Sequence, residues 1–224
     1  MNDAINFMNI EGLKFFGRVN ASISHELKNI LAIISETTGF LNDLTELAKQ
    51  GKDLKLSLIE SCSKSIAEEI QRGFTTIKQM NSFAHNVDVP IKETNLGDLL
   101  DLTVKLSKFL SFASTVHTPA PDQKMKPVLT CPFLLQNLIY QVLCFAYESV
   151  GPEGKVDICF NSKDDNGIHL LFSLPVTMET KDFPTEKIQK SADVLGIAIT
   201  VKNSEFILWI PFSSDKITQM ASLL

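Results

Sequence analysis

The sequence lacks the features that would assign it to a membrane or to a nucleic acid. No apolar run approaches the roughly 20 residues that a membrane-spanning helix needs. The N-terminus, with Asp3 and Glu11, does not show the basic-then-apolar order of a signal peptide. The formal net charge is −5, whereas a nucleic-acid binder usually carries a basic stripe and an anionic membrane attracts basic surfaces. We therefore expect a cytoplasmic protein with no membrane and no nucleic-acid partner.

Cysteine is also scarce. The four cysteines are widely spaced, lie mostly in apolar stretches and form no CxxC pair: Cys62, Cys131, Cys144 and Cys159. Closely spaced pairs are the usual sign of a structural zinc site or a redox motif. We therefore expect reduced thiols in the core, no disulfide and no metal site.

Hydrophobic residues make up 44% of the 224 residues, which is enough for two small domains. The first, residues 1–88, shows apolar residues mostly in steps of three and four on either side of a polar turn at 49–53, which predicts an antiparallel helical hairpin. The first stripe is Phe16, Val19, Ile23, Leu27, Ile30, Ile34, Leu41 and Leu44. The second stripe is Ile59, Cys62, Ile66, Ile70, Gly73, Ile77, Met80 and Ala84. A single hairpin hides only part of these stripes, so we expect two copies to pair as a four-helix bundle, that is, a homodimer.

Residues 89–224 mix helices and strands. Asn95 can cap a helix that continues through Leu110, and Pro132 opens a strongly apolar helix that ends at Val150. The other expected elements are a strand at 127–129, a β-hairpin of strands at 155–160 and 168–174, a helix at 184–195, and strands at 197–201 and 206–210. We predict an α+β fold in which the helical hairpin precedes an α/β sandwich, with helices on one face of a mostly antiparallel sheet.

The run from Ser24 to Asn29 carries the candidate chemistry. At about 100° of turn per residue, His25 and Asn29 lie one turn apart on the same helical face, and Glu26 lies on the adjoining face. His25 comes two residues after Ile23, so it points away from the apolar stripe. A lone histidine on such a helix is usually an ordinary surface residue, but a histidine, an acid and an amide that meet one incoming partner indicate a phospho-accepting histidine.

The residues from Ile23 to Asn29 resemble the H box of the transmitter core of bacterial sensor histidine kinases. The resemblance extends over nearly the whole chain and implies a dimerisation hairpin followed by a GHKL-type ATP-binding domain. Residues 80–85 and 94–100 are similar to the linker between the two domains, residues 134–150 to the helix that carries the N box, Gly196-Ile197-Ala198 to the end of the second glycine box, and residues 206–212 to the closing strand.

The chain departs from this family at the nucleotide site. Phe145 stands before Ala146, where the family has a magnesium-binding asparagine, and Gln141 stands one turn earlier. The segment Leu174–Met178 lacks the Asp-x-Gly box that recognises adenine, and residues 183–195 contain no glycine and leave no room for the usual ATP lid. A triphosphate commonly needs dense backbone donors and a counter-ion. We therefore interpret this domain as a degenerate ATP-binding domain kept as a scaffold.

Together these residues predict a histidine phosphotransferase that relays phosphoryl groups between response-regulator receiver domains through His25. Glu26 could orient the ring or accept its proton, and the resemblance implies a phosphatase or positioning role for Asn29; each could also be an ordinary solvated residue. The chain would need no cofactor of its own, because Mg²⁺ would be held by the partner receiver. Three alternatives stay open: a divergent ATP-dependent sensor histidine kinase, a response-regulator phosphatase, and a non-catalytic adaptor that binds receivers.

Overall fold

The computed structural model describes residues 2–108, 115–119, 125–161, 166–175, 182–202 and 204–221. The chain divides into two compact units. One is the segment Arg18–Ser82, and the other combines Met1–Gly17 with Phe83–Leu224. The division predicted from the sequence, 1–88 and 89–224, keeps the whole hairpin in one domain, whereas the compact units place the first 17 residues with the α/β part.

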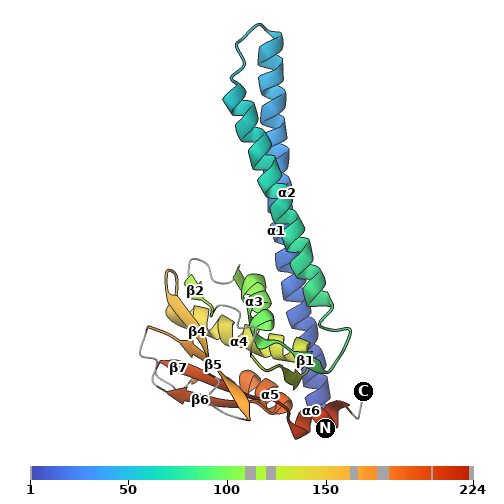
Figure 1. The fold of residues 1–224 in the computed structure, drawn as a ribbon, viewed down its shortest axis with the longest axis vertical. Helices are drawn as coiled ribbons and strands as arrows, with labels where there is room; N and C mark the ends of the chain where they lie inside the picture. The colour runs from blue at the N-terminus through green and yellow to red at the C-terminus, as the bar shows by residue number, and fades with distance from the viewer. Residues whose placement is uncertain are drawn as a thin grey trace. The chain divides into compact units, whose positions relative to one another are not determined.

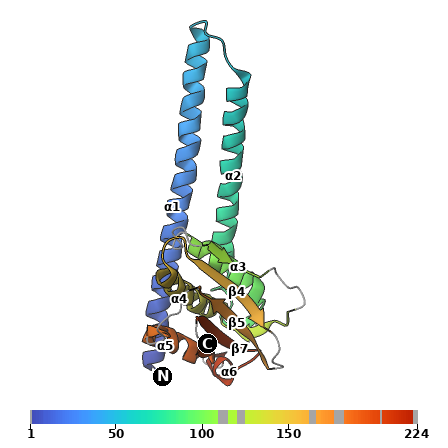
Figure 2. The ribbon, with the colours of Figure 1, turned by 90° about the vertical axis from the view of Figure 1, so that its left-hand side faces the viewer.

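The helical hairpin consists of α1, Asn2–Lys49, and α2, Leu56–Ala84. The two helices lie side by side in both views and run in opposite directions (Figures 1 and 2). The turn between them contains Gly51 at φ 80°, a left-handed conformation that glycine adopts without a steric penalty. The predicted hairpin and its polar turn are therefore confirmed.

The hairpin has an inner and an outer apolar stripe. The buried members in the compact unit of the hairpin include Ile23, Ile30 and Leu44 on α1, and Cys62 on α2. Large apolar side chains of the outer stripe are exposed in the single chain: Leu31, Ile70, Phe74 and Ile77. The second stripe predicted from the sequence thus mixes residues that face α1 with residues that face outward.

The α/β unit is built on a five-stranded sheet with the strand order β2-β4-β5-β7-β6. Only β2 and β4 pair in parallel; the other neighbours are antiparallel. The strands are β2 Thr115–His117, β4 Lys155–Asn161, β5 Gly167–Ser173, β6 Ala198–Lys202 and β7 Glu205–Pro211. A separate two-stranded sheet pairs β1, Lys92–Thr94, with β3, Val128–Thr130. The helices are α3 Leu96–Ser107, α4 Pro132–Val150, α5 Glu186–Leu195 and α6 Asp215–Ala221.

Local sequence explains where these helices begin. The Asn95 side chain accepts hydrogen bonds from the backbone N–H groups of Gly97 and Asp98, which caps α3 as predicted. Pro132 occupies the first turn of α4, where its missing N–H costs nothing. The α+β fold class is confirmed, whereas β1, β2 and α6 were not predicted from the sequence.

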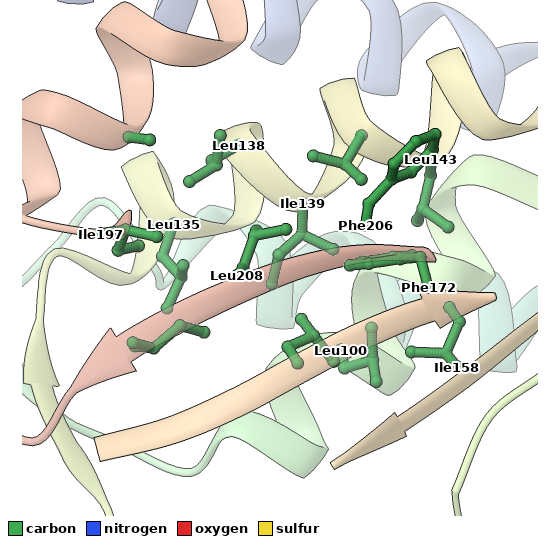
Figure 3. Packing of buried hydrophobic residues seen from close by; sticks show 14 of the residues in the cluster. Leu100, Leu135, Leu138, Ile139, Leu143, Ile158, Phe172, Ile197, Phe206 and Leu208 are labelled. Atoms are coloured by element: carbon green, nitrogen blue, oxygen red, sulfur yellow. The ribbon is translucent and has the colours of Figure 1, made fainter. Parts of the chain in front are cut away.

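The core of this unit lies between α4 and the sheet. Ile139 and Leu143 of α4 face the strands, and Phe206 rises from β7 toward α4, with Leu208 and Phe172 alongside (Figure 3). Each of these side chains is at most 1% exposed. Complete burial of such a side chain contributes about 1.5–3 kcal/mol relative to leaving it in water, so α4 is the central element of this domain.

The beginning of α1 belongs to the same unit through an aromatic contact. Phe15 is 2% exposed, and its ring lies 4.9 Å from Tyr140 and 5.3 Å from Phe83, centroid to centroid. The predicted stripe contained Phe16, which is 37% exposed and whose ring stacks on Phe83 at 5.6 Å, whereas the buried Phe15 was not predicted from the sequence. Helical periodicity over the hairpin carries no information about this contact, because its partners include α4.

Candidate functional site

His25 lies on α1 and is exposed, as its position two residues after the buried Ile23 predicts. The ring is held by a neighbour on the same helix, because the Asn29 side-chain amide nitrogen lies 3.3 Å from His25 Nδ1. The structure therefore brings the predicted histidine and amide together one turn apart on one face.

The amide of Asn29 can select the ring tautomer. With its nitrogen toward Nδ1 it donates to an unprotonated Nδ1, and the ring proton then lies on Nε2. With the amide turned over, its oxygen accepts from Nδ1–H, and the Nε2 lone pair faces solvent as a nucleophile. The tautomer that can attack phosphorus through Nε2 thus needs an acceptor at the position that Asn29 holds.

Glu26 is engaged by the second helix. Its Oε1 atom accepts from both Nε and Nη2 of Arg72, at 2.8 and 2.6 Å. Nη1 of the same guanidinium contacts Glu69 at 3.0 Å, one turn earlier on α2. Glu26 is thus bound across the hairpin beside the histidine, while the predicted role of its carboxylate in orienting or deprotonating the ring stays a prediction.

Sequence reasoning missed Arg72, although it is one of only two arginines in the chain. It lies 46 residues from Glu26, so the pairing depends on the register of two helices that no local pattern specifies. The hydrogen bond with Glu26 raises the pKa of Arg72, partial burial opposes that change, and the charges of both glutamates raise it further. One cation is thus shared by Glu26, the residue that follows the histidine, and Glu69 on the second helix.

The second region of interest is the nucleotide site that the resemblance implies. Phe145 of α4 lies 5.0 Å from the ring of Phe183, just before α5, and 5.7 Å from that of Phe206 on β7. Phe183 and Phe206 stack at 3.9 Å, and both are buried. These three rings, here called the aromatic cluster, fill the space next to the position where the family has its metal-binding asparagine.

Gln141, one turn before Phe145, forms hydrogen bonds within and between helices of the α/β unit. It donates to the Asn137 side chain on α4 at 3.1 Å and to Ser191 on α5 at 3.4 Å, and it is buried. The side chain thus ties two helices together. Of the adenine-box segment, Leu174 and Pro175 are described, and the remaining residues through Met178 lie outside the described part of the chain.

The start of α5 is occupied by side chains of the chain itself. Thr185 caps the start of α5 by accepting from the Ile188 N–H, and Glu186 adds a carboxylate to the first turn. A negative side chain there satisfies the positive end of the helix and competes with an anionic ligand. Gly196, which resembles the end of a glycine box in sequence, ends α5 at φ 71°, where glycine is favoured for conformational reasons.

The described residues contain neither a metal-ligand cluster nor a membrane-spanning helix. Among them, no group of three or more histidine, cysteine or acidic side chains is placed to hold a metal ion. In the same ranges, no helix combines the length and the apolar character required to cross a membrane.

Comparisons with known proteins give a likeness in structure only. No protein-family model and no curated protein sequence matches the chain. The catalytic domain of histidine kinase ThkA is 19% identical at a TM-score of 0.42, covering 57% of this chain and 99% of that one. Acinetobacter baumannii histidine kinase AdeS is 10% identical at a TM-score of 0.42, covering 84% of this chain and 98% of that one.

A third similar structure is histidine kinase ThkA in complex with the response regulator protein TrrA. It is 19% identical at a TM-score of 0.40, covering 89% of this chain and 62% of that one. At these identities and TM-scores the function has to follow from the residues of this chain.

Proposed function

We propose that this chain is a phosphorelay histidine phosphotransferase that passes phosphoryl groups between receiver-domain aspartates through His25, without binding ATP. The observation that carries the proposal is the contrast between the two candidate sites. The histidine is exposed, with a polar partner on its own helix, whereas the aromatic cluster occupies the space beside the position of the family's metal ligand. The chemistry of the histidine is kept and that of the nucleotide is lost.

The transfer step needs no metal on this chain. The Nε2 lone pair of neutral His25 attacks the phosphorus of an aspartyl phosphate, the N–P bond forms, and the P–O bond to the aspartate carboxylate breaks. The aspartate leaves as a carboxylate. The proton on Nδ1 stays on the ring, where the Asn29 amide oxygen can accept its hydrogen bond. The reverse sequence delivers the group to another receiver, and Mg²⁺ would be held by the receiver in both directions.

We further propose that two copies pair through the outer stripe of the hairpin. Phe74 and Leu31 are both 64% exposed, and Ile70 and Ile77 are close to half exposed. Exposed apolar side chains of this size, three of them at steps of four and three residues along α2, are characteristic of protein–protein contacts. A second hairpin would bury them in a four-helix bundle, which supports a homodimer.

Phosphotransfer assays test the function directly. The purified chain is incubated with labelled ATP and, separately, with receivers of its own cell that already carry labelled phosphate. We expect acid-labile label on the chain only in the second case, lost in His25→Ala and kept in the control His85→Ala, which changes another exposed histidine.

The alternatives give different results in the same assay. Label taken directly from ATP would establish a divergent kinase. Loss of phosphate from the receiver without label on the chain would indicate a phosphatase, in which Asn29 would position water. Receiver binding without either change would indicate an adaptor, and each of these results would refute the relay.

A further inference from the structure

Glu26, the residue that follows His25, is an acid that already forms an ion pair with a cation on the second helix. Arg72 reaches across the hairpin and places two N–H donors on one oxygen of Glu26, at 2.8 and 2.6 Å. The Arg72 side chain is 41% exposed and that of Glu26 38% exposed, so the pair lies at the surface of the hairpin, on the residue that follows His25. Exposed ion pairs contribute little to folding, so stability does not explain why this contact sits beside the histidine.

We propose that Arg72 is a positioning residue of the phosphotransfer site, an inference that rests on the function proposed above. It holds the Glu26 carboxylate on the second helix and neutralises it. The incoming phosphoryl group therefore meets a histidine that has no free anion beside it.

The chemical reason lies in two effects of an unpaired carboxylate at this position. It would favour the protonated form of the neighbouring imidazole, which has no lone pair to attack with. It would also repel the phosphoryl group and the acidic pocket of the receiver. With Arg72 in place, two glutamates and one guanidinium carry a combined charge of −1 instead of −2, and the ring keeps Asn29 as its hydrogen-bond partner.

The geometry favours arginine over lysine at this position. Three nitrogens are used at once, two toward Glu26 and one toward Glu69. A lysine offers a single charged nitrogen and can neutralise one carboxylate without fixing its direction. Arg72→Lys should therefore lie between the wild type and Arg72→Gln in every measurement below.

The kinetic test uses the full chain and a phosphorylated receiver. At low salt, Arg72→Gln should slow transfer to His25 about tenfold, and the deficit should shrink toward about twofold near 1 M salt, because the interaction of exposed charges is then screened within about 3 Å. The matched control is Arg18→Gln, which removes the other arginine of the chain, an exposed residue of α1, and should leave the rate unchanged within twofold.

A second substitution separates neutralisation from direct contact. If Arg72 acts through Glu26, the double variant Glu26→Gln, Arg72→Gln should transfer faster than Arg72→Gln alone. If the double variant is as slow as the single one and salt does not help, Arg72 touches the phosphoryl group or the receiver itself. That result would overturn the proposal.

A spectroscopic measurement does not depend on phosphotransfer. With isotope-labelled ring nitrogens assigned through His25→Ala, the His25 resonances at neutral pH should move toward the protonated form in Arg72→Gln, return in the double variant, and stay unchanged in Arg18→Gln. Identical resonances in the wild type and Arg72→Gln would refute the inference even if the relay itself is correct. A wild-type chain that takes no phosphate from any receiver would refute the relay, and the resonances would then decide the role of Arg72 alone.

Discussion

Removal of the Phe145 ring should destabilise the α/β unit without creating a nucleotide site. The ring is half-buried and contacts two buried aromatic rings at 5.0 and 5.7 Å. A fully buried Phe→Ala change costs about 3–5 kcal/mol, and a half-buried ring should cost less, about 2–3 kcal/mol for Phe145→Ala. For a protein of this size that corresponds to a decrease in Tm of about 5–10 °C. Phe145→Leu, which keeps most of the volume, should lose less than half as much.

The assay can be confined to this unit, because the single tryptophan, Trp209, lies on β7 of its sheet. Urea titrations followed by its fluorescence give the free energy of unfolding. Phe145→Asn restores the residue type that the family uses for magnesium, yet the surrounding rings offer it no polar partner, so it should be at least as unstable as the alanine variant and show no binding of ATP-magnesium by calorimetry. Unchanged stability, or nucleotide binding at micromolar affinity, would contradict the interpretation of the aromatic cluster.

Three further outcomes are expected. Ile30→Glu should unfold the hairpin, because Ile30 is 3% exposed within the single chain, whereas Ile70→Glu should leave the helices intact by circular dichroism and give a monomer by light scattering, since Ile70 is 46% exposed. Burial raises the pKa of the Glu11 carboxyl, but its ion pairs with Lys187 and Lys14 outweigh burial and lower it below its usual value. Glu11→Gln should therefore lower the free energy of unfolding by about 1–3 kcal/mol at pH 7. The difference from the wild type should shrink as the wild-type carboxylate takes up a proton below pH 4.5. Asn29→Gln, which keeps an uncharged acceptor for Nδ1–H, should transfer phosphate faster than Asn29→Leu, and equal rates would contradict the tautomer argument for His25.

The sequence was sufficient where a pattern is local and periodic. The hairpin, the cap at Asn95, the helix start at Pro132 and the exposure of His25 depend on local sequence within one element, and all agree with the structure. The residues that matter most to the proposals were out of reach of such reasoning. Arg72 contacts Glu26, 46 residues away, and Phe183 contacts Phe145, 38 residues away, each on another element. Only the folded structure shows which residues form these contacts.

The first turns of α1 show a second limit. Apolar spacing continues without interruption from the start of the helix into the hairpin, so the sequence predicts one helix and one set of partners. The helix is indeed continuous, but Phe15 packs against Phe83 and Tyr140, and Glu11 pairs with Lys187 of α5. A helical pattern reports that a face is covered and does not identify what covers it.

The same ambiguity bears on assembly. In the second predicted stripe, Cys62 is buried within the single chain, while Ile70 and Ile77 are exposed by more than 40%. A repeat of three and four residues fits both kinds of position, because adjacent apolar rows on one helix have the same spacing. Burial separates the two rows: the inner row holds the two helices of one chain together, and the outer row is exposed in the single chain. The proposed homodimer therefore depends on the outer row alone, and charge introduced there should break assembly while leaving His25 on a folded hairpin.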